Sequence, residues 1–350
     1  MDNFDEYLRQ GEPKKAEKAT VWKTAIGLQQ IDGLTPSAYL IETAKQNIEG
    51  DITFEQVKQL IDSYYKQHPT QANEDRTEEA DKVSARIAEM LSELTFTFSP
   101  AEFLNIHRRL FQGIYKFAGK IRDYNITKQE WVLNGETVLY GSAESLKATL
   151  EYDFEQEKQF SYKGLSLQET IEHIAKFISF LWQIHIFGEG NTRTIAIFLI
   201  KYLRTFGFKV NNELFEEHSW YFRNALVRAN YKNFATGIDA TYEFLFRFFG
   251  NLLLGETNTL QNRHLHIDFN DTVKTQNDTV NRTVDTVNDT VNDMVFSLLS
   301  NDKNITATEI SKRLNISLSK VKRRLKYLKG EGILERIGSD KTGYWKVLKK

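Results

Sequence analysis

The sequence predicts a mainly α-helical fold, in which a large helical domain precedes a smaller C-terminal domain. Two observations support this fold class. The 350 residues include only 4 prolines and 19 glycines, too few turn formers for an all-β protein. Apolar residues recur at helical spacing as far as about Leu254, where the composition changes.

Composition excludes several classes of protein. Hydrophobic residues make up 41% of the chain and aromatic residues 13%, enough for a packed core. The absence of cysteine excludes disulfide scaffolds, thiol catalysis and cysteine-based zinc sites. The longest apolar runs, such as Ile195–Ile200, are too short to cross a membrane, and the polar start Met1–Gln10 is unlike a signal peptide. We therefore expect a cytoplasmic protein with no membrane partner.

The net charge of −1 hides an uneven distribution of charge. Residues 293–350 contain 14 Lys and Arg against 6 Asp and Glu, whereas the remaining residues contain 32 against 41. A basic C-terminal domain on an acidic body favours two partners of different charge. Ordinary solvated helix faces are the alternative explanation.

Four segments follow from these patterns: a polar N-terminal segment (1–20) that is expected to fray, the helical domain (21–254), a linker (255–292) and the C-terminal domain (293–350). One stretch of the helical domain favours strands instead. Two β-prone runs within Trp131–Tyr140 flank Asn134-Gly135, a pair typical of a type I′ turn. We predict a β-hairpin there, which must pack on other elements or bind a partner because isolated hairpins are marginally stable.

The linker is rich in Asn, Asp, Thr and Val. Asp-Thr-Val recurs every seven residues from Asp271 through Asp278 to Asp285, and its valines follow the spacing of one helix edge. The same residue types are poor helix formers. A short coiled coil that would make the protein a homodimer and a plain linker both stay open.

The C-terminal domain resembles a winged helix-turn-helix domain. Its expected elements are helices at Asp293–Ser300, around Ser311–Leu314 and at Leu318–Lys329, then strands at Ile333–Ile337 and Tyr344–Val347, with a wing at Ser339–Gly343. The third helix carries the cations Lys320, Lys322, Arg323, Arg324, Lys326 and Lys329. Such a helix can enter a major groove while its cations contact phosphates, so duplex DNA is the expected partner. A winged helix that binds protein is the alternative.

The clearest candidate site is a loop between two apolar helices. Ser166 and Glu169 form a capping box at the start of the first helix, and the second helix begins near Asn191. Between them stands His185-Ile-Phe-Gly-Glu-Gly-Asn-Thr-Arg193. Glycine-containing backbone that leads into a helix is a typical anion site, because free N–H groups converge where the helix dipole is positive.

Three side chains of this loop suit phosphate chemistry. Arg193 can make a bidentate phosphate contact. Glu189 fits if Mg²⁺ lies between it and the phosphates, since Mg²⁺ commonly takes one or two carboxylates. His185 can act as a base near neutral pH. Each residue alone has an ordinary structural explanation, but the joint spacing H-x-F-x-E-G-N-x-R favours phosphoryl or nucleotidyl transfer to a hydroxyl.

This spacing resembles the hallmark of the Fic (filamentation induced by cAMP) family, H-P-F-x-[D/E]-G-N-G-R-x-x-R. The resemblance covers about residues 20–250 and includes Ala118-Gly-Lys-Ile-Arg122, which is similar to the family's upstream A-G-x-x-R. It implies a helical Fic fold that transfers AMP from ATP, with Mg²⁺, to a Ser, Thr or Tyr hydroxyl of a target protein.

The resemblance also implies roles for individual residues. His185 would deprotonate the target hydroxyl, and Glu189 would hold Mg²⁺ on the phosphates. The anion-binding residues would be Gly190, Asn191, Thr192 and Arg193. The hairpin would be the family's flap, on which the target adds as a strand, with Val138, Leu139, Tyr140 and Gly141 lining the nucleotide. Tyr221 and Asn230 lie in a segment similar to the one that closes the adenosine pocket, and an ordinary amphipathic helix is the alternative there.

Three positions depart from the family's motif. Ile186 replaces Pro, Thr192 replaces Gly, and Ala196 replaces the second Arg, the group that meets the γ-phosphate in the family. The protein then holds ATP with one cation fewer or uses another donor, for which Arg204 is a candidate. Transfer of phosphate alone, as in the related Doc proteins, is disfavoured because their motif has A-N-K where this one has G-N-T.

Many Fic proteins carry an inhibitory helix with [S/T]-x-x-x-E-[G/N], whose Glu pairs with the second Arg. The segment Lys45–Gly50 keeps the Glu-Gly pair, but Lys45 stands in the Ser/Thr position and Ala196 removes the partner. Glu49 therefore either faces Arg193 as a regulatory residue or is an ordinary helix-end carboxylate. Two functions follow: a Fic-type protein adenylyltransferase, or a degenerate Fic domain that senses a nucleotide within a DNA-binding regulator.

Overall fold

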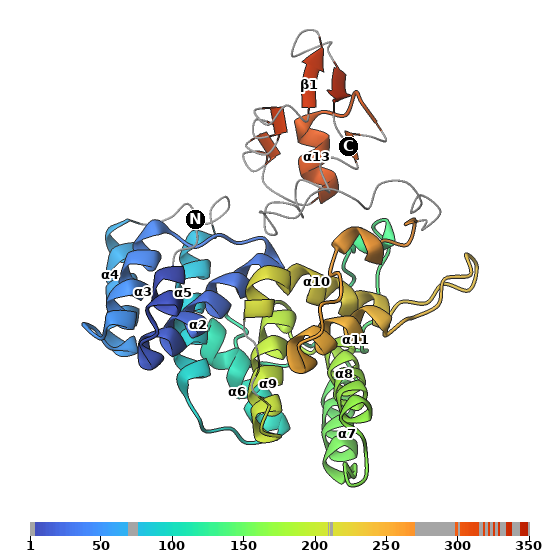
Figure 1. The fold of residues 1–350 in the computed structure, drawn as a ribbon. Coiled ribbons are helices and arrows are strands. Elements are labelled where there is room, and N and C mark those ends of the chain that lie inside the picture. Colours follow the sequence, from blue (N-terminus) through green and yellow to red (C-terminus); the bar gives the residue numbers. More distant parts are fainter. Residues whose placement is uncertain are drawn as a thin grey trace. The chain divides into compact units, whose positions relative to one another are not determined.

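The computed structural model describes residues 4–68, 76–208, 210, 213–269, 298–299, 302–314, 318, 321–322, 325, 328–329, 334–337 and 344–348. The chain divides into two compact units, residues 1–267 and residues 268–350. Helices dominate the first unit, and short helical segments and a small antiparallel sheet make up the described part of the second (Figure 1). Within the described ranges, every helix is too short or too polar to span a bilayer.

The first unit is a succession of helices, with one long connection between Phe111 and Leu146. Its helices are α1 (Asp5–Gln10), α2 (Pro13–Gly27), α3 (Ala38–Glu49), α4 (Phe54–Gln67), α5 (Thr77–Ser92), α6 (Pro100–Phe111), α7 (Leu146–Gln159), α8 (Leu167–Ile184), α9 (Asn191–Thr205), α10 (Glu213–Ala229) and α11 (Glu243–Phe249). The shorter turns are the 3-10 segments η1 (Leu28–Asp32), η2 (Trp131–Leu133) and η4 (Asn262–Leu265) and the π-helical segment η3 (Gly250–Leu254). The predicted mainly helical fold is confirmed.

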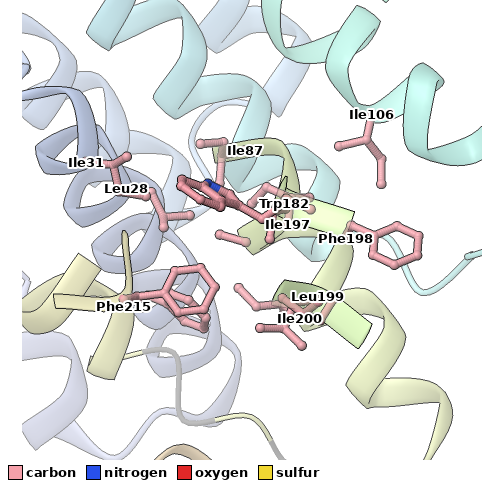
Figure 2. Packing of buried hydrophobic residues seen from close by; sticks show 14 of the residues in the cluster. Leu28, Ile31, Ile87, Ile106, Trp182, Ile197, Phe198, Leu199, Ile200 and Phe215 are labelled. Carbon is pink, nitrogen blue, oxygen red and sulfur yellow. The ribbon is translucent and has the colours of Figure 1, made fainter. Parts of the chain in front are cut away.

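Helix α9 is the centre of this unit. It contacts α5, α6, α8 and η1, so its apolar side chains are covered on every side. Consecutive residues such as Ile197, Phe198 and Leu199 point in different directions, yet all three are 0% exposed (Figure 2). Burying side chains of this size contributes about 1.5–3 kcal/mol each. The N-terminus of α9, where the candidate loop ends, is therefore held on a rigid support.

Helix α8 leads into the candidate loop, which ends at the N-terminus of α9. It begins with the predicted capping box, in which Ser166 and Glu169 bond reciprocally to each other's backbone N–H groups. Its apolar face packs against α7 and α9, and Trp182 is buried in the core shown in Figure 2. The loop His185–Gly190 thus joins two helices that are each fixed by packing.

The N-terminal segment differs from the prediction that residues 1–20 fray. Residues 5–10 form α1, and residues from Pro13 onward belong to α2. Phe4 and Tyr7 are buried in the core, and Lys23 pairs with Asp5 at 2.7 Å. The two aromatic side chains give this otherwise polar segment enough apolar area to pack.

The predicted β-hairpin is partly wrong. The type I′ turn is present: Asn134 and Gly135 have φ values of 55° and 85°, and the Glu136 N–H donates to the Leu133 carbonyl at 3.0 Å. The flanking runs do not pair as strands, and Trp131–Leu133 form η2 instead. Val132 and Leu133 are both 0% exposed, whereas a hairpin with one face toward solvent would bury only one of two consecutive residues.

The predicted start of the linker at residue 255 is too early. Residues 255–267 belong to the first unit, where Leu260 and Leu265 are buried. The Ile267 N–H also donates to the Val132 carbonyl at 2.9 Å. The predicted Asp-Thr-Val helix edge, and with it the homodimer hypothesis, lies outside the described residues.

The second unit contains α13 (Ala307–Leu314) and the strands β1 (Leu334–Ile337) and β2 (Tyr344–Val347). The strands pair antiparallel, with Leu334 opposite Val347. Its core comprises Leu299, Ile305, Ile310, Val321, Leu325, Leu328 and Leu334. In the predicted third helix, the described residues are helical: Leu318, Val321, Lys322, Leu325, Leu328 and Lys329. Lys320, Arg323, Arg324, Lys326 and the wing Ser339–Gly343 lie outside the described part of the chain.

Candidate active site

His185 ends helix α8 in a left-handed backbone conformation, with φ 49° and ψ 54°. Its N–H donates to the Trp182 carbonyl at 3.0 Å, and its ring Nδ1 lies 3.3 Å from the same oxygen. A carbonyl oxygen can only accept, so Nδ1 carries the ring proton and Nε2 keeps the lone pair. A left-handed conformation is uncommon outside glycine, and such strain is typical of functional positions.

The His185 imidazole is neutral at physiological pH. Burial holds its pKa well below the usual range, and the positive charges of Lys128, Arg223 and Arg122 lower that pKa further. The Tyr140 ring covers the imidazole at a centroid distance of 4.3 Å. A neutral imidazole with a lone pair on Nε2 is the form that accepts a proton from a hydroxyl.

Arg122, the last residue of the segment that resembles A-G-x-x-R, fixes the position of His185. Its Nε donates to the His185 carbonyl at 2.8 Å, and its Nη2 donates to the Gly141 carbonyl at 2.5 Å. Its backbone N–H donates to the Ile186 carbonyl at 3.0 Å. Arg122 therefore joins the candidate loop to the segment 136–141 that follows the type I′ turn.

Asn191 closes the loop on itself. Its side-chain oxygen accepts from the Phe187 N–H at 3.0 Å, and its side-chain nitrogen donates to the Phe187 carbonyl at 2.7 Å. Asn191 is 4% exposed and Phe187 is 0% exposed. The Asn191 side chain therefore shapes the backbone of the candidate loop.

His107 of α6 packs against the loop, a role that its position in the sequence does not indicate. Its ring stacks on Phe187 at 3.7 Å, its Nε2 donates to the Glu189 carbonyl at 2.9 Å, and its Nδ1 accepts from the Gly119 N–H at 2.8 Å. Burial lowers its pKa to about 4. No local signal distinguishes it from any histidine on an amphipathic helix, because its partners are distant in sequence.

Gly190 starts α9 with φ 77° and has no side-chain cap. A Cβ there would lie 2.4 Å from the Phe111 ring, so both the conformation and the space require glycine. The first N–H groups of any helix lack intrahelical acceptors, which makes this end of α9 attractive to an anion. Next to it, the Thr192 hydroxyl accepts from the Trp182 indole at 2.9 Å and is turned into the core.

The Arg193 side chain is buried among protein partners, whereas the sequence suggested that it binds phosphate. The side chain is 0% exposed. Its guanidinium pairs with Asp32 and with Glu79, each at 2.7 Å, and donates to Gln29 at 3.0 Å. Two carboxylates from distant helices engage its donors. Within the motif, backbone amides rather than this side chain are left to meet an anion.

Glu189 is half exposed and pairs with Lys128, whose Nζ lies 3.0 and 3.1 Å from its two oxygens. The described residues contain no cluster of three His, Asp or Glu side chains that could hold a metal unaided. A single accessible carboxylate fits Mg²⁺ that arrives with a nucleotide, since Mg²⁺ then takes its other ligands from phosphates and water. Glu189 is the residue that would hold it.

The segment after the turn alternates between core and solvent. Val138 and Tyr140 are 2% and 8% exposed, whereas Leu139 between them is 84% exposed. The Tyr140 hydroxyl donates to the buried Glu130 at 3.1 Å, and Glu130 also pairs with Arg223 at 2.7 Å. The Gly141 N–H donates to the Gln183 carbonyl at 3.3 Å. This alternation marks extended backbone beside His185, with Leu139 facing outward.

The structure places four other candidate residues away from the loop. Tyr221 is 1% exposed and packs near Phe248 in the core, whereas Asn230 is half-buried and its side-chain amide donates to the Ser179 hydroxyl. Arg204, at the far end of α9, donates to the Leu91 carbonyl at 2.6 Å. Glu49 pairs with Lys15 at 2.8 Å and not with Arg193, as an ordinary helix-end carboxylate does.

Two segments of the chain match models of known families. Residues 97–203 match the model of the Fic/DOC family, and residues 294–335 match the winged helix-turn-helix DNA-binding model. The resemblances inferred from the sequence are therefore confirmed at the level of domains, within residues 97–203 for the Fic/DOC family and 294–335 for the winged helix. The matched Fic/DOC segment contains His107, Arg122, His185 and Arg193.

Individual relatives are distant. A stretch of 129 residues, 37% of this chain, is 26% identical to the protein adenylyltransferase VbhT of Bartonella schoenbuchensis. The match spans 24% of that relative's length. A Fic family protein from Desulfovibrio desulfuricans G20 has a TM-score of 0.46 at 14% identity, covering 100% of this chain and 93% of that one. The N-terminal Fic domain of Bep8 from Bartonella sp. 1-1C has a TM-score of 0.41 at 19% identity, covering 52% and 88% respectively.

Proposed function

We propose that this protein is a Fic-type protein adenylyltransferase that transfers AMP from ATP to a Ser, Thr or Tyr hydroxyl of a target protein. The observation that carries the proposal is the loop from His185 to Asn191. This loop runs from the neutral imidazole of His185 to the N-terminus of α9, where no side chain caps the first amides, and it contains the accessible carboxylate of Glu189. The match of residues 97–203 to the Fic/DOC family and the distant adenylyltransferase relative support it.

In this reaction the target hydroxyl oxygen attacks the α-phosphorus of ATP, and the bond to the β-phosphate oxygen breaks. His185 Nε2 takes the hydroxyl proton, AMP becomes esterified to the target, and pyrophosphate leaves. The amides at the start of α9 stabilise the negative charge of the phosphates. Mg²⁺, when bound at Glu189, would neutralise part of that charge. The extended segment around the exposed Leu139 is where a target strand would add.

Substituting the base tests the mechanism. We expect His185→Ala to lower the rate of AMP transfer by about 10²–10⁴-fold, the usual contribution of a general base. Binding of Mg·ATP should change little, because the α9 amides and Glu189 stay in place. Transfer of labelled AMP to protein in a lysate measures the first, and calorimetry measures the second. His68→Ala, at the exposed end of α4, is the control. Equal labelling by His185→Ala and the wild type would exclude this mechanism.

A nucleotide sensor without transferase activity is the second candidate function. The observation in its favour is that neither motif arginine position supplies a phosphate contact: position 196 is alanine, and Arg193 is enclosed by carboxylates. Tight binding of Mg·ATP with no labelled protein product in any lysate would favour the sensor. Labelling that depends on His185 would favour the enzyme.

We also infer that the C-terminal unit binds duplex DNA. Its match to a winged helix-turn-helix DNA-binding model and the surplus of positive charge in residues 293–350 support this inference. Fluorescence anisotropy of labelled duplex, titrated with the full chain over a range of salt concentrations, tests it.

A further inference from the structure

The phosphate site lacks an arginine contact from either of the two motif positions. Ala196 stands at the second arginine position and is 0% exposed within α9. Arg193 is enclosed by Asp32 and Glu79, and Arg204 is bonded to a carbonyl at the other end of the helix. A triphosphate bound at the start of α9 would therefore need a cation from outside the motif.

Lys128 is a cation outside the motif that lies next to Glu189. It belongs to the segment before the type I′ turn, 61 residues from Glu189 in sequence, yet its ammonium contacts both carboxylate oxygens. It also lies close enough to His185 for its charge to help lower the pKa of that imidazole. Its backbone N–H donates to the Thr137 hydroxyl at 3.2 Å, which anchors the residue across the turn.

The Lys128 side chain is able to exchange partners. It is 24% exposed, and its four-carbon stem and rotating ammonium allow it to follow a phosphate oxygen. In the nucleotide-free protein the ammonium neutralises Glu189. When Glu189 serves Mg²⁺, the ammonium is released beside the phosphates, so each charged group keeps a partner of opposite charge.

We propose that Lys128 binds the substrate's phosphates and supplies the cation that Ala196 removes from the motif, with Glu189 as its partner in the resting state. This inference rests on the proposed nucleotide site. It assigns Lys128 to the β- or γ-phosphate region rather than to the adenosine.

Nucleotide affinity tests the assignment without any measurement of transfer. Lys128→Gln in the full chain should weaken binding of Mg·ATP by about tenfold, the effect of losing one charged hydrogen bond, and should leave adenosine binding unchanged. Lys128→Arg should retain most of the affinity. Lys120→Gln, which removes the same charge from an exposed lysine in the same loop, is the matched control and should bind as the wild type does. Calorimetry with each ligand provides the values.

A double-mutant cycle tests the exchange of partners. Without Mg²⁺, Glu189→Gln should tighten ATP binding several-fold because it releases Lys128. The gain in ATP affinity from Glu189→Gln should be smaller when the same change is made in the Lys128→Gln protein. Three results would overturn the inference. Lys128→Gln could bind Mg·ATP as tightly as the wild type, or it could lose as much affinity for adenosine as for Mg·ATP. Glu189→Gln could also raise the ATP affinity equally with and without Lys128. A wild type that binds Mg·ATP but labels no protein would overturn only the transferase. A wild type that binds no nucleotide would overturn both.

Discussion

At the scale of single residues, Arg193 shows that a motif position does not fix a role. Its sequence position suggests a phosphate ligand, yet its guanidinium lies in the interior between Asp32 and Glu79. Its charge and the nearby Arg76 lower the pKa of the Glu79 carboxyl, although burial acts in the opposite direction. Arg193 thereby ties the start of α9 to η1 and α5.

We predict that Arg193→Ala lowers the free energy of unfolding by about 3–5 kcal/mol, because Asp32 and the buried Glu79 both lose the guanidinium with which they pair. Urea denaturation of the full chain measures the change. Arg247→Ala removes an exposed arginine paired with Glu243 within α11, and it should cost less than about 1 kcal/mol. An Arg193→Ala protein of unchanged stability and weaker Mg·ATP binding would instead make Arg193 a phosphate ligand.

At the scale of elements, the parts determined locally were predictable from the sequence. Three predicted features depend only on neighbouring residues and are present in the structure. They are the capping box at Ser166, the start of α9 at Gly190 and the type I′ turn at Asn134-Gly135. The lack of strand pairing beside that turn was not predictable, because burial of both Val132 and Leu133 depends on distant segments. The same applies to His107, whose partners lie on other segments.

Helix α6 supports the loop only while His107 is neutral. Its pKa is about 4 in the folded protein and about 6.5 in an unfolded chain, so the unfolded state binds more protons between these values. Stability from this group is present above pH 6.5 and is lost as the pH falls toward 4. We predict that the wild type loses about 2 kcal/mol more than His107→Gln between pH 7 and pH 5. Urea denaturation at both pH values provides the comparison, with His68→Gln as the control. Parallel losses in the wild type and in His107→Gln would contradict it.

At the scale of the whole molecule, contacts between residues distant in sequence could not be predicted from the sequence. Asp32 and Glu79 lie 161 and 114 positions before Arg193, and the apolar anchors Phe4 and Leu265 lie at opposite ends of the first unit. No local pattern links such residues. The division of charge, by contrast, is visible in the sequence, since composition needs no contacts. It sets the acidic first unit apart from the basic second one.

That division leads to the last prediction, that the full chain binds duplex DNA through the basic residues of its second unit. If four to six cations neutralise phosphates, log K should fall with log salt at a slope of about −4 to −5, because each contact contributes about −0.9. Arg323→Glu/Arg324→Glu should weaken binding and reduce the slope by about 2. Lys349→Glu/Lys350→Glu makes the same change of charge outside the expected recognition helix and should have a smaller effect. Docking of the basic unit onto an acidic protein would also depend on salt, so anisotropy of the labelled duplex must be measured directly. Absence of duplex binding at low salt would refute the prediction, and an equal effect of the two double substitutions would exclude the helix at Leu318–Lys329 as the main contact.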